Sequence, residues 1–509
     1  MIARKFNWCI YINTVLLIVL SIYFFFYPAI TILHEMQDPG LKAGNVPHFT
    51  FGWHRSLSRD YAVWAQERVA SGEAAGLNIN NISGTEWPVF GTVFYLSSTE
   101  SLQQAWEKDP TLYPVAPAEY ALDAIEASAA LVADPGHAGW VRQHWGDDYL
   151  SRENLFYRML LISGLTSYQK LTGNDQYEDL LREQVESLSK ELDESAYGLL
   201  DDYPGQCYPV DILPAIAAIQ RADKVLGTDH SQFVQRALRG FQGGVLDEET
   251  GLPAYIADSR TGVGYGPARG AGISFMLIGA PELWPVTSQE WYANYENYFW
   301  KQTWATAGFR EFSRDLSYGS WAGDVDSGPI LAGYGTAASA FGIGAARAFG
   351  RYDHSYPLSV EALSASWPLP DGTRLGPRML SNLSDAPYIG EVSLLFALTR
   401  LQITEGRVPT NGFVPASAYF GISFYLIMGI AFSRRALRSL DDWKKNMTMP
   451  IPNPKLQFTL WCIFSLIGLV SFFLFDRVIG LFCLLLAQTF PSGNRIGSWL
   501  IDYDFLKTA

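Results

Sequence analysis

Residues 198–211, GLLDDYPGQCYPVD, combine acids, tyrosines and a thiol directly before a predicted helix. Besides Asp201, five side chains in this stretch are the main candidates for exchanging protons or binding a polar ligand, namely those of Asp202, Tyr203, Cys207, Tyr208 and Asp211. Paired carboxyl groups suit general acid and general base work, because a dry pocket raises the pKa of one while the other stays ionised. We therefore expect the two acids and the thiol to be catalytic and the two tyrosines to bind substrate.

Two of these residues also have simpler interpretations. Asp211 can be the N-cap of the helix DILPAIAAIQRAD, with Pro214 in its first turn. Cys207 is either a thiolate activated near the start of that helix or a small buried apolar residue. Neither simpler role accounts for Asp202, so the stretch remains a candidate site.

A second acidic stretch, SWAGDVDSGPI, precedes another predicted helix. Asp324 and Asp326 stand among small and apolar residues, which is more typical of a cavity rim than of a charged surface. One of them can cap the helix, and we expect the pair to have a catalytic role. The neighbouring Trp321 offers a flat ring for stacking on a sugar, so we expect it to bind substrate.

Further charged residues stand in loops and in apolar helices. In YGPARGAGIS, the guanidinium of Arg269 can clamp an anionic or polyhydroxyl ligand. In GFREFSRD, Arg310 and Glu311 form either a substrate-binding pair or a structural ion pair. Glu391 is expected to be catalytic because a buried acid in an apolar helix needs a partner or a function. Glu153 precedes another predicted helix and is expected to bind substrate.

Several classes of function are disfavoured by what the sequence lacks. The seven histidines form no HxxxH pair and there is no CxxC motif, so we expect no metal site. There is no GxGxxG loop, Walker loop or GxSxG elbow, so we expect no cofactor and no classical serine chemistry. A net charge of −14 disfavours nucleic acid as a partner.

The elements that must position these residues are predicted to be mainly helical. Apolar residues at helical spacing predict helices over 117–133, 152–172, 176–194, 211–226, 231–242, 289–305, 327–349 and 388–401. Loops starting at Gly198, Gly251 and Gly308 recur at intervals of about 55 residues, and each leads into an apolar helix. Helical hairpins of this kind must stack on one another. About six closed into a ring give an (α/α)6 toroid, and an open solenoid is the alternative.

Apolar runs at both ends of the chain predict membrane segments. Charged residues make up only 17% of the sequence, which is low for a soluble protein. The apolar runs are residues 8–33, 413–432, 456–475 and 478–490. The first three are long enough to span a bilayer, and the fourth is short enough to be tilted or re-entrant. We therefore expect the lipid bilayer to be a partner.

The basic residues orient these segments. Arg4 and Lys5 precede the first run, and several arginines and lysines follow the second. The positive-inside rule places both groups in the cytoplasm and the residues between the two runs outside it. The expected domains are an anchor over 1–39, an extracytoplasmic (periplasmic) domain over 40–411 and a membrane region over 412–509. We therefore expect a multi-pass protein of the cell membrane.

The stretches RENLFYRMLLISGLTSYQKLTGNDQYEDLL, DDYPGQCYPVD and DVDSGPILAGYG resemble, in order and type of motif, the linalool dehydratase/isomerase family. The likeness covers about residues 85–400. It implies an (α/α)6 barrel and cofactor-free hydration, dehydration and isomerisation of a small isoprenoid alcohol. Cys207 corresponds to one of the family's active-site cysteines. Residues 40–411 contain no second cysteine, and the C-terminal membrane segments depart from the family pattern.

Three functions are consistent with these features. The first is a membrane-anchored glycoside hydrolase or lyase that uses paired carboxylates on a cell-envelope glycan or glycolipid. The second, implied by the resemblance, is a hydro-lyase or isomerase acting on an isoprenoid-like alcohol. The third is a non-enzymatic binding or assembly subunit whose C-terminal helices dock another membrane protein.

Overall fold

The structure is a computed structural model that describes residues 8–316, 321–324, 327–382, 384–445, 454–474 and 477–487. Its contacts divide the chain into two compact units. Unit 1 comprises Met1–Glu35, Ser364–Met379 and Ala418–Ala509, and unit 2 comprises Met36–Leu363 and Leu380–Ser417. The predicted division at 40–411 differs from this one, because a short internal segment, Ser364–Met379, belongs with the terminal helices.

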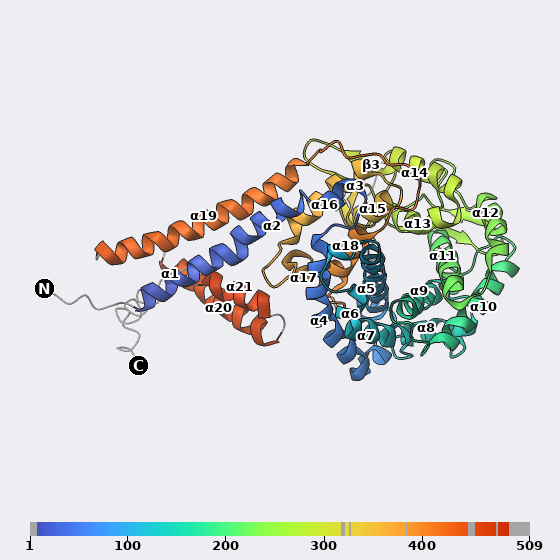
Figure 1. Ribbon diagram of the computed structural model, residues 1–509, viewed down its shortest axis with the longest axis horizontal. Helices are drawn as coiled ribbons and strands as arrows, with labels where there is room; N and C mark the ends of the chain where they lie inside the picture. The colour runs from blue at the N-terminus through green and yellow to red at the C-terminus, as the bar shows by residue number, and fades with distance from the viewer. Residues whose placement is uncertain are drawn as a thin grey trace. The chain divides into compact units, whose positions relative to one another are not determined.

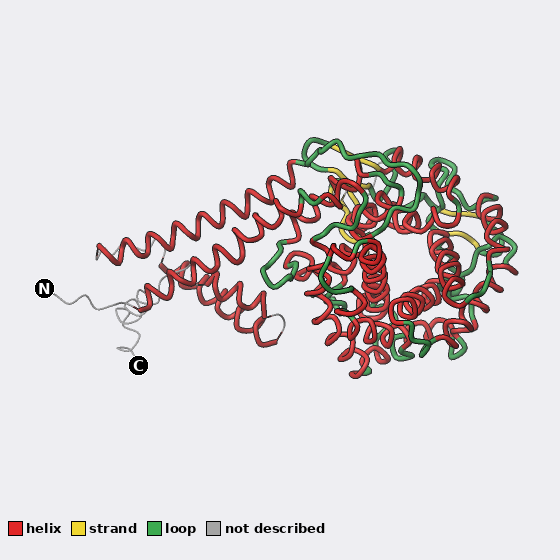
Figure 2. The backbone as a smooth tube through the Cα atoms, in the orientation of Figure 1, coloured by secondary structure: helices red, strands yellow, loops and turns green. Residues whose placement is uncertain are grey.

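Unit 2 is mainly helical, and six of its helices contact one another in a closed cycle. They are α5 (Ile82–Lys108), α9 (Leu155–Thr172), α11 (Pro209–Leu226), α13 (Gly270–Leu283), α15 (Thr336–Ala348) and α18 (Ile389–Thr399). Each packs against the next in this order, and α18 packs against α5. Figure 2 shows these helices arranged around a common centre. The three recurring loops predicted from the sequence precede α11, α13 and α15.

A second set of helices alternates with these six along the chain. It comprises α4 (Phe49–Ser71), α7 (Leu122–Ala133), α10 (Glu178–Glu194), α12 (Val234–Gln242), α14 (Pro285–Phe299) and α16 (Tyr352–Ser366). Figure 1 shows α10, α12 and α14 on the outside of the ring. In α10, the buried residues Leu181, Val185, Leu188 and Leu192 recur at helical spacing on one side. This is the amphipathic pattern of a helix that packs one face against a core.

The remaining short helices connect these elements. They are α3 (Pro39–Ala43), α6 (Pro117–Tyr120), α8 (Gly139–Trp145) and α17 (Leu375–Ser381), with 3-10 turns at Glu73–Gly76, Pro110–Leu112, Tyr149–Ser151 and Ser231–Phe233. Helix α6 begins at a proline in the first helical position, where the missing N–H is not needed. The predicted helix 117–133 therefore consists of two consecutive helices, α6 and α7.

Unit 2 also contains short antiparallel strands in the loops between its helices. They are β1 (Ile256–Asp258), β2 (Val263–Tyr265), β3 (Trp300–Gln302), β4 (Ala307–Phe309), β5 (Trp321–Asp324), β6 (Gly328–Leu331) and β7 (Tyr334–Gly335). Strands β1–β2 and β3–β4 form hairpins, and β5–β6–β7 forms a three-stranded sheet.

The sequence-based prediction of one helix over 327–349 was wrong in its first part. The strands β6 and β7 occupy that part, and the helix begins at Thr336. Gly328 and Gly333 adopt left-handed backbone conformations, with φ of 60° and 86°, which a right-handed helix does not contain. Pro329 also removes a backbone donor, so this segment favours turns and short strands.

Unit 1 contains two helices that are long and apolar enough to cross a membrane. One covers Thr14–Ala43, which extends into unit 2, and the other covers Ala416–Arg438. The first includes the second part of α1 (Trp8–Ser21), a π-helical turn (Ile22–Phe26), α2 (Tyr27–Glu35) and α3, and the second is part of α19 (Ala416–Lys445). Helices α20 (Pro454–Leu474) and α21 (Arg477–Ala487) pack against each other and are shorter apolar segments.

Side chains of the internal segment fasten it to the terminal helices within unit 1. The guanidinium of Arg374 donates two hydrogen bonds to the carboxylate of Glu35, at 2.5 and 2.9 Å, and both side chains are buried. The indole of Trp367 donates to the backbone carbonyl of Phe24 at 2.7 Å. Each of these buried charges needs the other, because leaving one of them buried without its partner costs about 3–5 kcal/mol of free energy.

Candidate active site

A tight turn in residues 198–208 presents the predicted catalytic stretch at the start of α11. Gly205 has φ of 77°, and its N–H donates to the carboxylate of Asp201 at 2.8 Å. The Asp202 N–H donates to the carbonyl of Gln206 at 2.9 Å, which closes the turn. Pro209 then opens the helix in the first position. The local sequence therefore fixes the backbone that carries the acids.

Asp202 is buried at the centre of this turn. One carboxylate oxygen accepts the Tyr208 N–H at 2.7 Å. The other, Oδ1, has no direct hydrogen-bond partner among the described residues, although the Phe156 N–H lies near enough to the carboxylate to stabilise its charge. Burial, and then the charge of Asp211, raise the pKa of Asp202 well above its ordinary value. Asp202 can therefore hold a proton under conditions in which an exposed aspartate cannot.

Asp211 lies in the first turn of α11, while the N-cap position belongs to Tyr208. The simpler interpretation of Asp211 as the N-cap is therefore incorrect. A negative charge in the first turn still interacts favourably with the helix dipole. The charge of Asp211 also raises the pKa of Asp202.

Tyr203 joins this loop to α5 through a residue that the sequence reasoning missed. Its hydroxyl donates to Glu86 at 2.7 Å. The ring contacts His144 and Trp140, with centroids 5.1 and 6.2 Å apart. Burial, and then the charge of Glu86, raise the pKa of Tyr203, and burial lowers the pKa of His144. Tyr203 thus stays a hydrogen-bond donor, and His144 tends to be neutral.

Cys207 is fully buried beside the acids. Its carbonyl accepts the Ala257 N–H at 2.9 Å, which connects the loop to β1. Burial, and then the charge of Asp202, raise the pKa of the thiol far above its usual range. The thiol is therefore protonated at neutral pH, which disfavours the activated thiolate considered from the sequence.

Glu153 belongs to the same group of acids. Its carboxylate accepts the Asp201 N–H at 2.6 Å, and burial raises its pKa. The next residue, Asn154, is buried with φ of 36° and turns the chain into α9. Asparagine tolerates this left-handed conformation better than most residues do. The structure thus brings together six predicted site residues: Glu153, Asp202, Tyr203, Cys207, Tyr208 and Asp211.

Arg269 and Glu311 form a buried ion pair at the start of α13. The guanidinium Nε lies 2.6 Å from a Glu311 oxygen, and the other oxygen accepts the Ala271 N–H at 3.1 Å. The guanidinium also packs on the ring of Tyr255 at 5.0 Å, and that ring contacts Tyr208 at 5.6 Å. This geometry favours the structural interpretation of the pair, which borders the acid cluster through two tyrosines.

The other predicted residues lie on separate elements. The backbone N–H of Arg310 donates to the carbonyl of Phe299 at 2.8 Å. Its side-chain Nε is buried without a hydrogen-bond partner in the described part of the chain. Glu391 is fully buried in the first turn of α18. Trp321 and Asp324 lie on β5, where the Trp321 side chain is exposed. Asp326 lies outside the described residues.

Phenylalanines from opposite sides of the ring meet at its centre. They are Phe90 and Phe94 of α5, Phe156 of α9, Phe275 of α13, Phe341 of α15 and Phe396 of α18. Helices α5 and α13 are three places apart in the cycle of six, yet the rings of Phe90 and Phe275 are 5.5 Å apart. These side chains therefore cross the interior of the ring and form an apolar floor. Four of them remain half-buried, namely Phe90, Phe156, Phe275 and Phe341.

The acid site lies directly next to this floor along α5. Glu86 and Phe90 are four residues apart, so their side chains share one side of the helix. An open groove of about 700 Å³ lies around the first turns of α5 and the β5–β6 hairpin. Its lining residues include Ser83 and Trp87 of α5 and Ala322 and Gly328 of the hairpin. Polar groups, an apolar floor and a groove thus occur within two turns of one helix.

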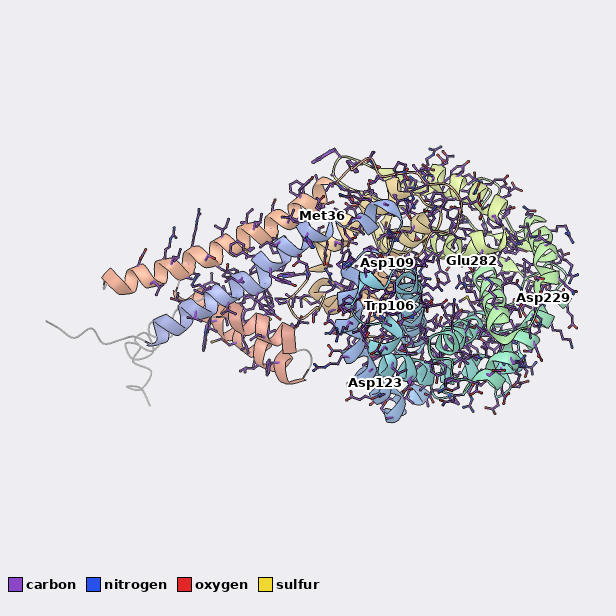
Figure 3. The ribbon with its side chains drawn as sticks, viewed as in Figure 1. Met36, Trp106, Asp109, Asp123, Asp229 and Glu282 are labelled. Atoms are coloured by element: carbon purple, nitrogen blue, oxygen red, sulfur yellow. The ribbon has the colours of Figure 1, made fainter. Side chains whose placement is uncertain are left out.

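Ion pairs occupy the opposite end of the ring, near the C-terminal ends of its helices. Glu100 of α5 pairs with Lys170 of α9 at 2.5 Å, and Arg221 of α11 pairs with Glu282 of α13 at 2.6 and 2.9 Å. Arg400, which follows α18, donates to the backbone of α5. Figure 3 labels Glu282 on its helix. Cations here suit the negative ends of the helix dipoles.

One group of acids and histidine among the described residues has the spacing of metal ligands. Glu296, Asp353 and His354 bring one ligand atom each within 4.8 Å. The guanidinium of Arg351 already donates two hydrogen bonds to each of the two carboxylates, at 2.5–2.9 Å. The positive charge of Arg351 therefore already neutralises these two carboxylates, and the group is better explained as an ion-pair network.

Glu86 carries a signal that sequence reasoning can use. It stands in TEWPVFGTVFYL, an acid near the start of an otherwise apolar helix, as Glu391 does in its own helix. The role of His144 and the meeting of the phenylalanines depend on contacts between distant segments, so no local pattern indicates them.

No protein-family model matches the chain, and no curated protein sequence matches it significantly.

Proposed function

We propose that the chain is a membrane-anchored (α/α)6-toroid enzyme that performs cofactor-free general acid–base chemistry at one end of its ring. The closed cycle of six helices, alternating along the chain with outer helices, supports the toroid. The two long apolar helices support anchoring, and the basic residues that flank the apolar runs favour a multi-pass protein with unit 2 on the extracytoplasmic side.

The observation that carries the proposal is the buried carboxyl of Asp202, which accepts the Tyr208 N–H at 2.7 Å and whose pKa is raised by burial and by the charge of Asp211. A carboxylic acid with a raised pKa can protonate the departing oxygen when a C–O bond breaks. A second, ionised carboxylate then takes a proton from water in a hydrolysis or from a neighbouring carbon in an elimination. Asp211 and Glu86 are the candidates for that base, and Tyr203 positions Glu86 through its 2.7 Å hydrogen bond.

The phenylalanine floor supports an amphiphilic substrate over a purely polar glycan. A sugar attached to a lipid places its polar end among carboxyl and hydroxyl groups and its apolar end against aromatic rings. Four half-buried phenylalanines next to Glu86 provide that apolar surface. The first proposed function is therefore cleavage of a membrane glycolipid by a hydrolase or lyase reaction.

The same floor favours a second candidate, dehydration or isomerisation of an isoprenoid-like alcohol. When a protonated hydroxyl leaves such an alcohol, positive charge develops on carbon, and aromatic faces stabilise a cation. Cys207, buried beside the acids, stands at the position that the resemblance assigns to an active-site cysteine. The two candidates share the acid Asp202 and differ in whether a sugar or water is released.

The test uses the full chain in lipid nanodiscs with two substrate panels, lipid-linked sugars and isoprenoid alcohols, and mass spectrometry of the products. Release of sugar supports the first candidate and loss of water the second. Asp202→Asn is expected to abolish turnover, and the neighbouring Asp201→Asn serves as the matched control that retains it. Substrate binding without turnover by the wild type would instead indicate a binding or assembly subunit.

A further inference from the structure

Large apolar side chains are exposed on two hairpins of unit 2. Trp304, in the β3–β4 turn, and Trp321, on β5, are each 74% exposed, and Leu331, on β6, is 50% exposed. Trp321 and Leu331 are cross-strand neighbours. The Nζ of Lys301 in β3 donates to the carbonyl of Ala332 beside β6 at 3.0 Å, which ties the two hairpins together. We call Trp304, Trp321 and Leu331 the apolar patch.

The β3–β4 turn is hydrogen-bonded to the first turn of α19. The Ala416 N–H donates to the carbonyl of Trp304 at 3.1 Å, and the Ser417 N–H donates to that of Ala305 at 2.8 Å. The Ser417 hydroxyl also bonds the carboxylate of Glu361 in α16. These hydrogen bonds place Trp304 beside the start of α19. From Ala416 onward, this helix is long and apolar enough to cross a membrane.

The other long apolar helix joins unit 2 at the same outer helix. The hydroxyl of Tyr356 in α16 donates to the carbonyl of Met36, labelled in Figure 3, at 3.3 Å. Met36 belongs to the apolar helix Thr14–Ala43. Tyr356 and Glu361 are five residues apart, or about 7.5 Å along a helix. Within unit 2, Met36 and Ser417, one from each apolar helix, therefore contact neighbouring points of α16, and the apolar patch adjoins the start of α19.

We propose that the apolar patch lies in the headgroup region of the bilayer, so that the groove at the ring opens beside the lipid surface. Tryptophan is enriched at that depth because its ring is apolar and its N–H is polar. The groove shares the β5–β6 hairpin with the patch, since Ala322 and Gly328 line the groove and Trp321 precedes Ala322. The proposal rests on the membrane anchoring proposed above and gives an amphiphile a route from the bilayer to the acid site.

Photocrosslinking in the intact protein tests this placement. Trp304→benzoylphenylalanine is introduced into the full chain in nanodiscs of phosphatidylcholine and phosphatidylglycerol, and lipid adducts are measured by mass spectrometry after irradiation. The matched control is Val286→benzoylphenylalanine, because Val286 is also 74% exposed. It lies in the first turn of α14, about 20 Å along that helix from β3.

We expect a lipid adduct at position 304 several-fold above that at position 286. An absent adduct, an equal adduct at both positions, or crosslinking of position 304 to a second protein copy overturns the proposal. Leu331→benzoylphenylalanine gives a second test should the position-304 variant not fold. The readout needs no turnover, so a lipid adduct in an inactive Asp202→Asn protein separates failure of the chemistry from failure of the placement.

Discussion

At the scale of single residues, Asp202 connects local sequence to chemistry most directly. The turn from Asp201 to Gln206 withdraws its carboxyl from water, and the start of α11 brings the charge of Asp211 near it. Both effects disfavour the ionised form, so the pKa rises. A surface aspartate of the same sequence type lacks both effects.

The raised pKa of Asp202 predicts a distinctive dependence of stability on pH. Between about pH 4, where an unfolded aspartate titrates, and the raised pKa of the folded state, the native protein binds a proton that the unfolded chain has lost. The free energy of unfolding therefore falls as pH rises through that interval, and Asp202→Asn removes the fall. Thermal unfolding in detergent across this range measures the difference.

Asp201→Asn is the control for this experiment, because Asp201 is only half-buried and accepts a backbone N–H in the same turn. The charge of Asp201 raises the pKa of Asp202 less than burial and the charge of Asp211 do, so this variant should retain most of the pH-dependent fall of the wild type. Parallel curves for the wild type and Asp202→Asn would contradict the protonated state assigned to Asp202.

Cys207 predicts slow alkylation in the folded protein. A thiol that is fully buried and has a raised pKa presents neither access nor thiolate to a maleimide. We expect modification of Cys207 under native conditions to be slower by orders of magnitude than in denaturant, as followed by peptide mass spectrometry. The half-buried Cys462 of α20 provides an internal comparison in the same sample. Rapid native labelling of Cys207 would show that the loop opens.

At the scale of elements, α5 has two distinct ends. Glu86 near its start belongs to the acid site, and Glu100 near its end pairs with Lys170. The phenylalanines between them fill the ring. One helix thus carries an acid of the acid site, part of the apolar floor and an ion pair at the opposite end of the ring. This explains why its sequence combines acids with aromatic residues.

The ion pair of Arg221 and Glu282 is predicted to stabilise the end of the ring opposite the acid site. Glu282→Gln leaves Arg221 partly buried without its charge partner. We expect a loss of about 1–2 kcal/mol, below the roughly 3–5 kcal/mol of a fully buried pair because both side chains keep some exposure. Denaturant unfolding in detergent measures the loss.

The matched control is Glu194→Gln, which removes the partner of Lys190 across 3.9 Å on the exposed side of α10. These side chains are 69% and 72% exposed, so the expected change is below about 0.5 kcal/mol. Equal losses of unfolding free energy in the two variants would show that the partial burial of the Arg221–Glu282 pair does not strengthen it.

At the scale of the whole molecule, the two units are interleaved in sequence. Ser364–Met379 leaves unit 2, joins the terminal helices and returns, and Arg374 in this segment pairs with Glu35. Removing the terminal helices therefore leaves a buried charge without its partner, which is a large cost. The terminal helices are therefore part of the folded structure around this segment.

A truncated variant without residues 1–35 and 418–509 is predicted to aggregate, as measured by size-exclusion chromatography. Arg374→Met in that variant should recover part of the monodisperse protein, because it removes the unpaired charge. Arg260→Met, at a side chain that is 88% exposed, is the control and should recover none. A monodisperse truncated variant that Arg374→Met does not improve would contradict this role of the ion pair.

The sequence predicted long and strongly patterned elements well. The predicted helices 211–226 and 388–401 correspond to α11 and α18 within a few residues. Helices α4, α5, α13 and α16 were missed, because α4 mixes polar and apolar residues on every side and the other three contain an internal proline. Their packing partners, and not their own propensities, stabilise them.

By itself, the sequence determined the mainly helical class, the long apolar segments and the gathering of acids, tyrosines and Cys207 in one loop. These features depend on neighbours in the chain, through periodicity, hydropathy and turn chemistry. Only the tertiary structure decided that Tyr203 meets Glu86, that Arg269 and Glu311 neutralise each other, and that Phe90 touches Phe275 across the ring. Those contacts join segments far apart in sequence, so no local pattern specifies them.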